Sequence, residues 1–287
     1  MTRDKFCRTR HPVNGTGKNI LLENLEDKME WGMKNRLSRI FNAKTGRSVM
    51  LAVDHGYFQG PTTGLRNIKK TTDPLLTYAD ALMITRGALR NWIPAEMDKP
   101  VILRVSGGQS ILKELSNEII TTSIEDVIRV NASAITCSVY IGGEHEKQSI
   151  KNLSKIVNQG QDYGIPVLAV TAVGKEMTRD SKYLSLACRI CVELGAHIVK
   201  TYYCERAFEE VIEACGNVPV VIAGGKKIEE RAALKMAKDA IKAGAVGVDM
   251  GRNVFQSNNP VGMIKAVRAI VHDDASINDA FKIYKKK

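Results

Sequence analysis

Short apolar runs rich in β-branched residues recur along this chain roughly every 20 to 30 residues, and helical patterns of apolar positions lie between them. This spacing is typical of repeated strand–helix units. The runs predict eight strands, at residues 48–54, 79–85, 101–105, 134–140, 165–171, 197–202, 218–223 and 245–250.

Near-continuous apolar strands that alternate with helices favour a parallel sheet covered on both faces. We therefore expect an α/β protein with a closed (β/α)8 TIM barrel. An open doubly wound sheet is the alternative. It is disfavoured because the chain contains neither G-x-G-x-x-G nor G-x-x-x-x-G-K-[ST], the glycine motifs of nucleotide-binding sheets. The last helix of the barrel is predicted to begin at Asn259-Pro260, a capping residue followed by a proline in the first turn.

The pattern predicts one domain, with a barrel at 48–272, an N-terminal extension at 1–47 and a C-terminal tail at 273–287. Apolar positions within 31–41 predict a helix in the extension that needs an apolar partner. The tail ends in three lysines, and we expect it to be frayed.

A lysine interrupts the sixth predicted strand on what should be an inward face. Ile198, Lys200 and Tyr202 share one side because strand side chains alternate. An amine that loses hydration among apolar neighbours can act as a nucleophile at neutral pH, which is the chemistry of a Schiff-base enzyme. The alternative is a lysine that merely extends to solvent from the strand end.

Polar residues at the other strand ends are the remaining candidates, because chemistry in such barrels lies at the carboxyl ends of the strands. Asp54 ends the first strand and is the best candidate for a general base or proton shuttle, unless it is simply paired with a neighbouring cation. His55 follows it and is either a second acid–base group or only an oriented loop residue.

The last two strand ends carry glycines and an arginine that suit a phosphate group. Glycines let backbone N–H groups approach a phosphate closely, and the loops after strands 7 and 8 are the usual phosphate site of this architecture. We expect this role for Gly224, Gly225, Gly251 and Arg252. The alternative is two ordinary turns with a surface arginine.

Composition narrows the class of protein further. The chain has 44% hydrophobic and 25% charged residues, with no apolar run near the roughly 20 residues that span a bilayer and no secretory signal at its start. We expect a cytoplasmic protein without a membrane partner. Part of the net charge of +11 lies in residues 1–47. This segment has no aromatic interleaving or nucleic-acid motif, so we expect a solvated arm or a subunit contact and no nucleic-acid partner.

The six cysteines suggest free thiols in a chain without a secretory signal. Cys188-x-x-Cys191 has the spacing of a redox or metal pair, but both residues lie on the apolar stripe of a predicted helix, which favours packing. No second CxxC or suitably spaced histidine completes a site, so no metal is expected.

Four motifs together resemble the class I, Schiff-base aldolase group that includes the archaeal-type fructose-bisphosphate aldolases. They are AVDHG at 52–56, IVKTYY at 198–203, IAGGKK at 222–227 and VDMGRN at 248–253. The resemblance implies a barrel enzyme in which Lys200 forms the Schiff base, Asp54 assists and the last two loops hold phosphate. It also implies a large homo-oligomer.

Further stretches, among them VYIGGEHEKQSIKN and VDMGRNVFQ, are most similar to a thiolase branch of that group. This similarity implies transfer of an acetyl group from a phosphorylated diketone to coenzyme A, in the breakdown of autoinducer-2. The products would be acetyl-CoA and dihydroxyacetone phosphate. Coenzyme A would be a co-substrate, and no cofactor would be bound permanently.

The chain departs from the aldolases of the group at one position. Those relatives place a catalytic tyrosine at the end of the fifth strand, where this chain has Ala172. Loss of that phenol should greatly slow aldol cleavage and leave room for a thiol beside the imine. Both effects favour the thiolase. An aldolase acting on a phosphorylated sugar such as fructose 1,6-bisphosphate is the alternative.

Overall fold

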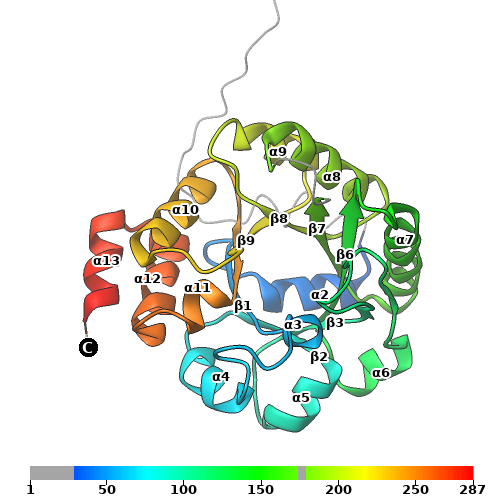
Figure 1. Ribbon diagram of the computed structural model, residues 1–287, viewed down its shortest axis with the longest axis horizontal. Coiled ribbons are helices and arrows are strands. Elements are labelled where there is room, and N and C mark those ends of the chain that lie inside the picture. Colours follow the sequence, from blue (N-terminus) through cyan, green and yellow to red (C-terminus); the bar gives the residue numbers. More distant parts are fainter. Residues whose placement is uncertain (1–28, 174–178, 287) are drawn as a thin grey trace, which may run out of the picture.

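The structure is a computed structural model that describes residues 29–173 and 179–286. Eight parallel strands close into a barrel in the order β1-β10-β9-β8-β7-β6-β3-β2, with helices outside it (Figure 1). The predicted (β/α)8 barrel is therefore confirmed. The barrel strands are β1 (Ser48–Ala52), β2 (Ala81–Thr85), β3 (Val101–Arg104), β6 (Ala134–Ile141), β7 (Val167–Val173), β8 (Ile198–Tyr202), β9 (Val220–Ala223) and β10 (Gly247–Met250).

The described residues form twelve helices, most of which alternate with these strands in the outer ring (Figure 1). They are α2 (Trp31–Ile40), α3 (Gly56–Gln59), α4 (Ile68–Leu76), α5 (Arg86–Trp92), α6 (Ile124–Arg129), α7 (Glu146–Tyr163), α8 (Ser181–Glu193), α9 (Phe208–Cys215), α10 (Glu230–Lys242), α11 (Arg252–Phe255), α12 (Pro260–Asp273) and α13 (Ile277–Lys285). The start predicted for α12 is confirmed, since the Asn259 side chain accepts a hydrogen bond from the Gly262 N–H at 3.0 Å and Pro260 opens the helix.

Strand alternation divides the core into two parts. Side chains such as Met50, Met83 and Ile198 fill the barrel interior, whereas Val199 belongs to the larger cluster between the strands and the helices. Lys200 therefore points inward, two residues along the strand from Ile198, as the sequence predicts.

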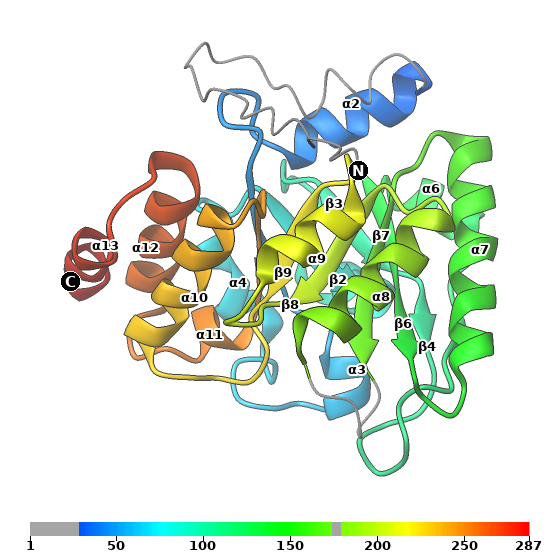
Figure 2. The same ribbon diagram turned by 90° about the horizontal axis from the view of Figure 1, so that it is seen from above.

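Helix α2 closes the amino-terminal end of the barrel (Figure 2). Its apolar face carries Met33, Leu37 and Ile40, all buried, and joins the same cluster as the barrel interior. The predicted helix and its need for an apolar partner are thus confirmed. Residues 1–28 of the extension lie outside the described residues.

A short antiparallel hairpin, not predicted, follows β3. It pairs β4 (Ser106–Gly107) with β5 (Ile119–Ile120), and it brings Glu118 beside the barrel mouth. Strands of two residues lie below the length that an alternating pattern can reveal.

The C-terminal tail is also more ordered than expected, because it contains α13 rather than a frayed end. Ser276 caps this helix by accepting a hydrogen bond from the Asp279 N–H at 3.1 Å, and Ala280 is buried. Asn259 donates from its side-chain amide to the Tyr284 carbonyl at 2.8 Å, which ties α13 to the start of α12. The run of terminal lysines led to the prediction of a frayed end, whereas the structure has a short amphipathic helix there.

The cysteines within the described residues are free and buried, namely Cys137, Cys188, Cys191, Cys204 and Cys215. Cys188 and Cys191 lie on the apolar face of α8, so their role in packing is confirmed. Cys7 lies outside the described residues. In the part of the chain that the structure describes, no helix is both long and apolar enough to cross a membrane.

Candidate active site

A cavity of about 360 Å³ opens at the carboxyl ends of the barrel strands. All the residues predicted from the sequence line it: Asp54, His55, Lys200, Gly224, Gly225, Gly251 and Arg252. They come together because β8, β9, β10 and β1 are consecutive neighbours around the barrel. Lys200 lies within β8, and each of the other residues stands just beyond the end of one of these strands.

Lys200 lies on the cavity floor and is paired with a carboxylate that the sequence analysis did not select. Its Nζ is 2.9 Å from Oδ2 of Asp249, a β10 side chain that is only 1% exposed. Burial raises the pKa of Asp249, and the nearby charge of Lys200 offsets only part of this effect. Inward alternation on the eighth predicted strand could have identified Asp249, since it faces the same interior as Lys200.

Asp54 is held by a cation, as its alternative interpretation stated. Arg104 donates from Nη1 to Asp54 Oδ2 at 3.1 Å, and both side chains are buried. Burial raises the pKa of Asp54, but Arg104 and Lys200 together outweigh that effect and lower the pKa below its usual value. Asp54 is therefore an anion at neutral pH, placed beside both Arg104 and Lys200.

His55 adjoins this anion and is neutral at physiological pH. Its Nδ1 is 4.0 Å from Asp54 Oδ1, and its ring stacks on Phe255 with centroids 5.7 Å apart. Burial lowers the pKa of His55 to about 4, despite the opposing effect of Asp54. Within the described residues, its Nε2 is buried without a hydrogen-bond partner.

The opposite side of the cavity is built from the loops after β9 and β10. Gly225 has a φ of +68°, which favours glycine, and a Cβ on Gly251 would lie 2.3 Å from the Ala52 carbonyl oxygen. Asn253 links the two loops by donating to the Gly224 carbonyl. Arg252 is half-buried at this edge, and burial lowers its pKa.

Two further cations line this side of the cavity, and the sequence analysis did not place them in the site. They are Lys226, in the loop after β9, and Arg179, whose guanidinium lies 3.7 Å from the centre of the Tyr202 ring. The glycine pattern gave no signal for Arg179, which follows β7 and belongs to a different loop.

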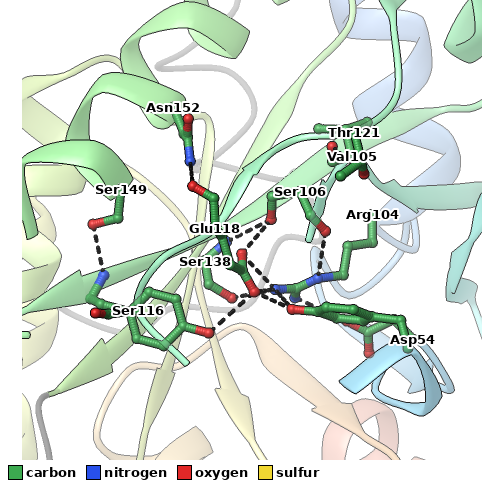
Figure 3. A network of polar contacts seen from close by, with 12 residues as sticks. Asp54, Arg104, Val105, Ser106, Ser116, Glu118, Thr121, Ser138, Ser149 and Asn152 are labelled. Atoms are coloured by element: carbon green, nitrogen blue, oxygen red, sulfur yellow. Dashed lines mark hydrogen bonds and ion pairs between the residues drawn. The ribbon is translucent and has the colours of Figure 1, made fainter. Parts of the chain in front are cut away.

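A buried polar network adjoins the floor of the cavity (Figure 3). Arg104 lies between Asp54 and Glu118, and its Nη2 donates to Glu118 Oε1 at 2.8 Å. Glu118 also accepts a hydrogen bond from Ser106 at 2.7 Å and is only 1% exposed. Burial lowers the pKa of Arg104, but Glu118 and Asp54 outweigh this effect and raise the pKa above its usual value. The guanidinium therefore stays charged.

Strand alternation could have revealed Arg104, because it shares the inward face of β3 with Ile102. No comparable signal marks Glu118, which reaches the network only through the hairpin. One other group could hold a cation among the described residues: ligand atoms of Glu114, Glu144 and His145 lie within 4.8 Å of one another. Glu114 already accepts a hydrogen bond from Ser116 at 2.6 Å.

A closed parallel barrel with an inward lysine, a buried carboxylate partner and cationic loops after its last two strands is the arrangement of an aldolase-type barrel enzyme. Residues 48–257 match the model of the DeoC/LacD family aldolases, and the chain belongs to this family.

Relatives with curated names are similar over most of the chain. The 3-hydroxy-5-phosphonooxypentane-2,4-dione thiolase of Escherichia coli (strain K12 / DH10B) is 56% identical over 256 residues, which cover 89% of this chain and 88% of that protein. An uncharacterized aldolase of Pasteurella multocida (strain Pm70) is 57% identical over the same shares. The resemblance drawn from the motifs is confirmed, and the chain is an enzyme of this group.

Solved structures agree with this assignment. The chain is 27% identical to an archaeal fructose 1,6-bisphosphate aldolase, with a TM-score of 0.74 over 84% of this chain and 99% of that one. A second solved structure, of an archaeal fructose-1,6-bisphosphate aldolase with the catalytic lysine covalently bound to the carbinolamine intermediate of the substrate, matches with the same TM-score, identity and coverage.

Proposed function

We propose that this enzyme is an acetyltransferase (thiolase) that cleaves 3-hydroxy-5-phosphonooxypentane-2,4-dione with coenzyme A through a Schiff base on Lys200. The observation that carries the proposal is the pairing of Lys200 with Asp249 on the floor of a cavity whose other side is cationic. The products are acetyl-CoA and dihydroxyacetone phosphate. The 56% identity to the curated thiolases supports this substrate.

The cationic side of the cavity supports one choice of the carbonyl that reacts with the lysine. We assign the phosphate to the loops that carry Gly224, Gly225, Gly251 and Arg252. Lys200 lies on β8, next to β9, which supports attack of its amine on the carbonyl nearest the phosphate, C4 of the dione.

Imine formation requires the neutral amine of Lys200. Asp249 is a suitable acceptor for the ammonium proton because burial already raises the pKa of this carboxyl. A neutral amine beside a neutral carboxyl also avoids the cost of two buried charges. Once the iminium forms, the positive charge returns to the nitrogen, and Asp54 provides a fixed anion to stabilise it.

Thiolysis then breaks the bond between C2 and C3. The thiolate of coenzyme A adds to C2, and the electron pair of the C2–C3 bond passes through C4 to the iminium nitrogen, which leaves an enamine. We assign the thiol proton to Nε2 of His55. The ring is neutral at pH 7, Nε2 has no hydrogen-bond partner among the described residues, and Nδ1 lies 4.0 Å from Asp54 Oδ1 on the other side of the ring.

Ala172 supports the thiolase over a sugar-phosphate aldolase. It lines the cavity, where its methyl group leaves space beside the proposed imine. We further propose a cytoplasmic homo-oligomer that acts in autoinducer-2 breakdown, with coenzyme A as co-substrate, no permanently bound cofactor and no nucleic-acid partner.

Reduction with borohydride tests the proposal. Dihydroxyacetone phosphate and borohydride added together should fix a three-carbon phosphate to the peptide that contains Lys200, as read by mass spectrometry. Lys200→Met should trap nothing and lose catalysis by several orders of magnitude, because the covalent intermediate is removed. Lys226, which lines the same cavity, and Lys227, which pairs with Glu230 at 2.9 Å, are internal controls.

Labelling of Lys226 or Lys227 in place of Lys200, or near-normal turnover by Lys200→Met, would refute the Schiff base. A parallel assay separates the two enzymes. A thiolase forms acetyl-CoA from the phosphorylated dione only when coenzyme A is present, whereas an aldolase releases triose phosphate from fructose 1,6-bisphosphate without it.

A further inference from the structure

We propose that Tyr140 is the acid that protonates the enamine carbon after the acetyl group has left. This inference rests on the proposed function, because the enamine exists only if Lys200 forms an imine. The group must be a proton donor that lines the cavity, stands above the lysine and is held in one position. Tyr140 meets each of these requirements.

The barrel register places Tyr140 above the lysine. Ser138 of β6 is level with Val170 of β7, which is level with Lys200 of β8. Tyr140 is two residues further along β6, and its side chain lines the same cavity as Lys200. At about 3.3 Å per residue, it begins roughly 6.6 Å nearer the mouth. A substrate attached to Lys200 must extend in that direction.

The residue beside Tyr140 leaves its ring room to reach the substrate. Its partner across the β6–β7 ladder is Ala172, which also lines the cavity. Because paired residues of parallel strands point to the same side, the tyrosine ring and the alanine methyl share one region of the wall. A larger side chain at 172 would compete with the ring for this space.

The phenol oxygen is fixed by the buried network rather than by solvent. Tyr140 donates to Glu118 Oε1 at 3.2 Å, and Arg104 holds the same carboxylate oxygen at 2.8 Å. The backbone of Glu118 is fixed in turn, since Asn152 donates to its carbonyl oxygen at 2.7 Å (Figure 3). The hydrogen bond from Tyr140 fixes the direction of the hydroxyl and does not involve Lys200, Asp54 or Asp249.

Tyr140 carries its proton at neutral pH. Burial raises the pKa of this phenol, the charge of Glu118 raises it further, and Arg104 offsets only part of the rise. The protonated phenol is the form that can donate a proton to the enamine carbon. Asp54, by contrast, is ionised and has no proton to give.

The step balances with water as the only other reactant. The O–H bond of Tyr140 breaks and a C–H bond forms at C3, which converts the enamine into the iminium of dihydroxyacetone phosphate. Water then adds its hydroxyl to C4 and returns its proton to the Tyr140 oxygen. Collapse of the carbinolamine releases the ketone and restores the Lys200 amine.

Hydrogen exchange isolates this step from thiolysis. Without coenzyme A, the wild-type enzyme should exchange a hydroxymethyl hydrogen of dihydroxyacetone phosphate with D2O, as read by NMR, because the reverse of the step forms the enamine. Tyr140→Phe should slow this exchange by about 10²–10⁴-fold, the usual range for a general acid. Borohydride should still trap the phosphate on Lys200 in this variant. Tyr202→Phe removes the other phenol that lines the cavity, and it should keep the exchange at saturating triose phosphate.

Trapping distinguishes the two proposals. If Tyr140→Phe is trapped normally and exchanges hydrogen at the wild-type rate, the role of Tyr140 is overturned and the Schiff base stays intact. Loss of exchange in Tyr202→Phe alone would lead to the same conclusion. No trapping in the wild type would refute the Schiff base, and the role of Tyr140 with it. Loss of both trapping and exchange in Tyr140→Phe would also reject the proposal, because the phenol would then be needed before the enamine forms.

Discussion

Charge is distributed unevenly between the two sides of the cavity. At the floor, the cations Lys200 and Arg104 are paired with the buried carboxylates Asp54, Glu118 and Asp249. This excess of negative charge stabilises a cation such as an iminium. The other side carries Arg179, Lys226 and Arg252, an excess of positive charge that suits a phosphate. A substrate with a phosphate at one end and a carbonyl further along therefore has one favoured orientation.

The anchoring role of Arg252 can be measured directly. Arg252→Ala should weaken substrate binding by roughly 1.5–3 kcal/mol, the range for a hydrogen bond to a charged group, and should raise KM more than it lowers kcat. The matched control is Lys227→Ala, since Lys227 is bound to Glu230 at 2.9 Å and is not among the residues that line the cavity. An unchanged KM in Arg252→Ala would place the phosphate elsewhere.

At the scale of elements, α8 illustrates how a chemically suggestive motif can serve packing. Cys188 and Cys191 are fully buried on the face that α8 turns toward the barrel, together with Leu184 and Ala187. The Cys188 thiol contacts Cys215 of α9, the neighbouring helix. Both thiols therefore fill space between elements rather than face the cavity.

Cavity-forming substitutions test this role. Cys188→Ala and Cys191→Ala should each lower the free energy of unfolding by about 1 kcal/mol, typical of a small core truncation, without abolishing turnover. Leu186→Ala on the exposed face of the same helix is the control and should change stability by less than about 0.5 kcal/mol. Denaturant unfolding provides the comparison. Loss of activity in a folded double variant, or metal in the purified protein, would contradict the packing role.

At the scale of the whole molecule, two buried histidines couple folding to pH. Burial lowers the pKa of both His55 and His197 to about 4. His197 is held neutral at the start of β8, where its Nδ1 accepts a hydrogen bond from the Val167 N–H at 3.2 Å. Unfolding exposes both rings to water and returns their pKa to near 6.5.

Stability should therefore fall as the pH is lowered from about 6.5 to about 4. The unfolded chain binds protons in this window and the folded chain does not, so each histidine can contribute a slope of up to about 1.4 kcal/mol per pH unit. Denaturant titrations at pH 7 and pH 5 measure this loss. His197→Asn should be less stable than the wild type at pH 7 but should lose less on acidification. An equal loss in both proteins would exclude His197 as a source of the pH dependence.

The sequence by itself determined the barrel and the residues that its motifs place at the mouth. Alternation along β8 placed Lys200 inside, and the order of the strands brought it to Asp54, His55 and the glycines of the last two loops. These inferences succeeded because a strand assigns each side chain to a face from local position alone. A parallel barrel then gathers the strand ends at one mouth.

Only the tertiary structure decided which groups act on one another there. The stagger between strands pairs Asp54 with Arg104 and brings Asp249 to Lys200. The hairpin of β4 and β5 brings Glu118 to Arg104. The register between β6 and β7 also places Tyr140 beside Ala172. Pairing distances and burial set the protonation states, and both arise only when segments far apart in the sequence meet.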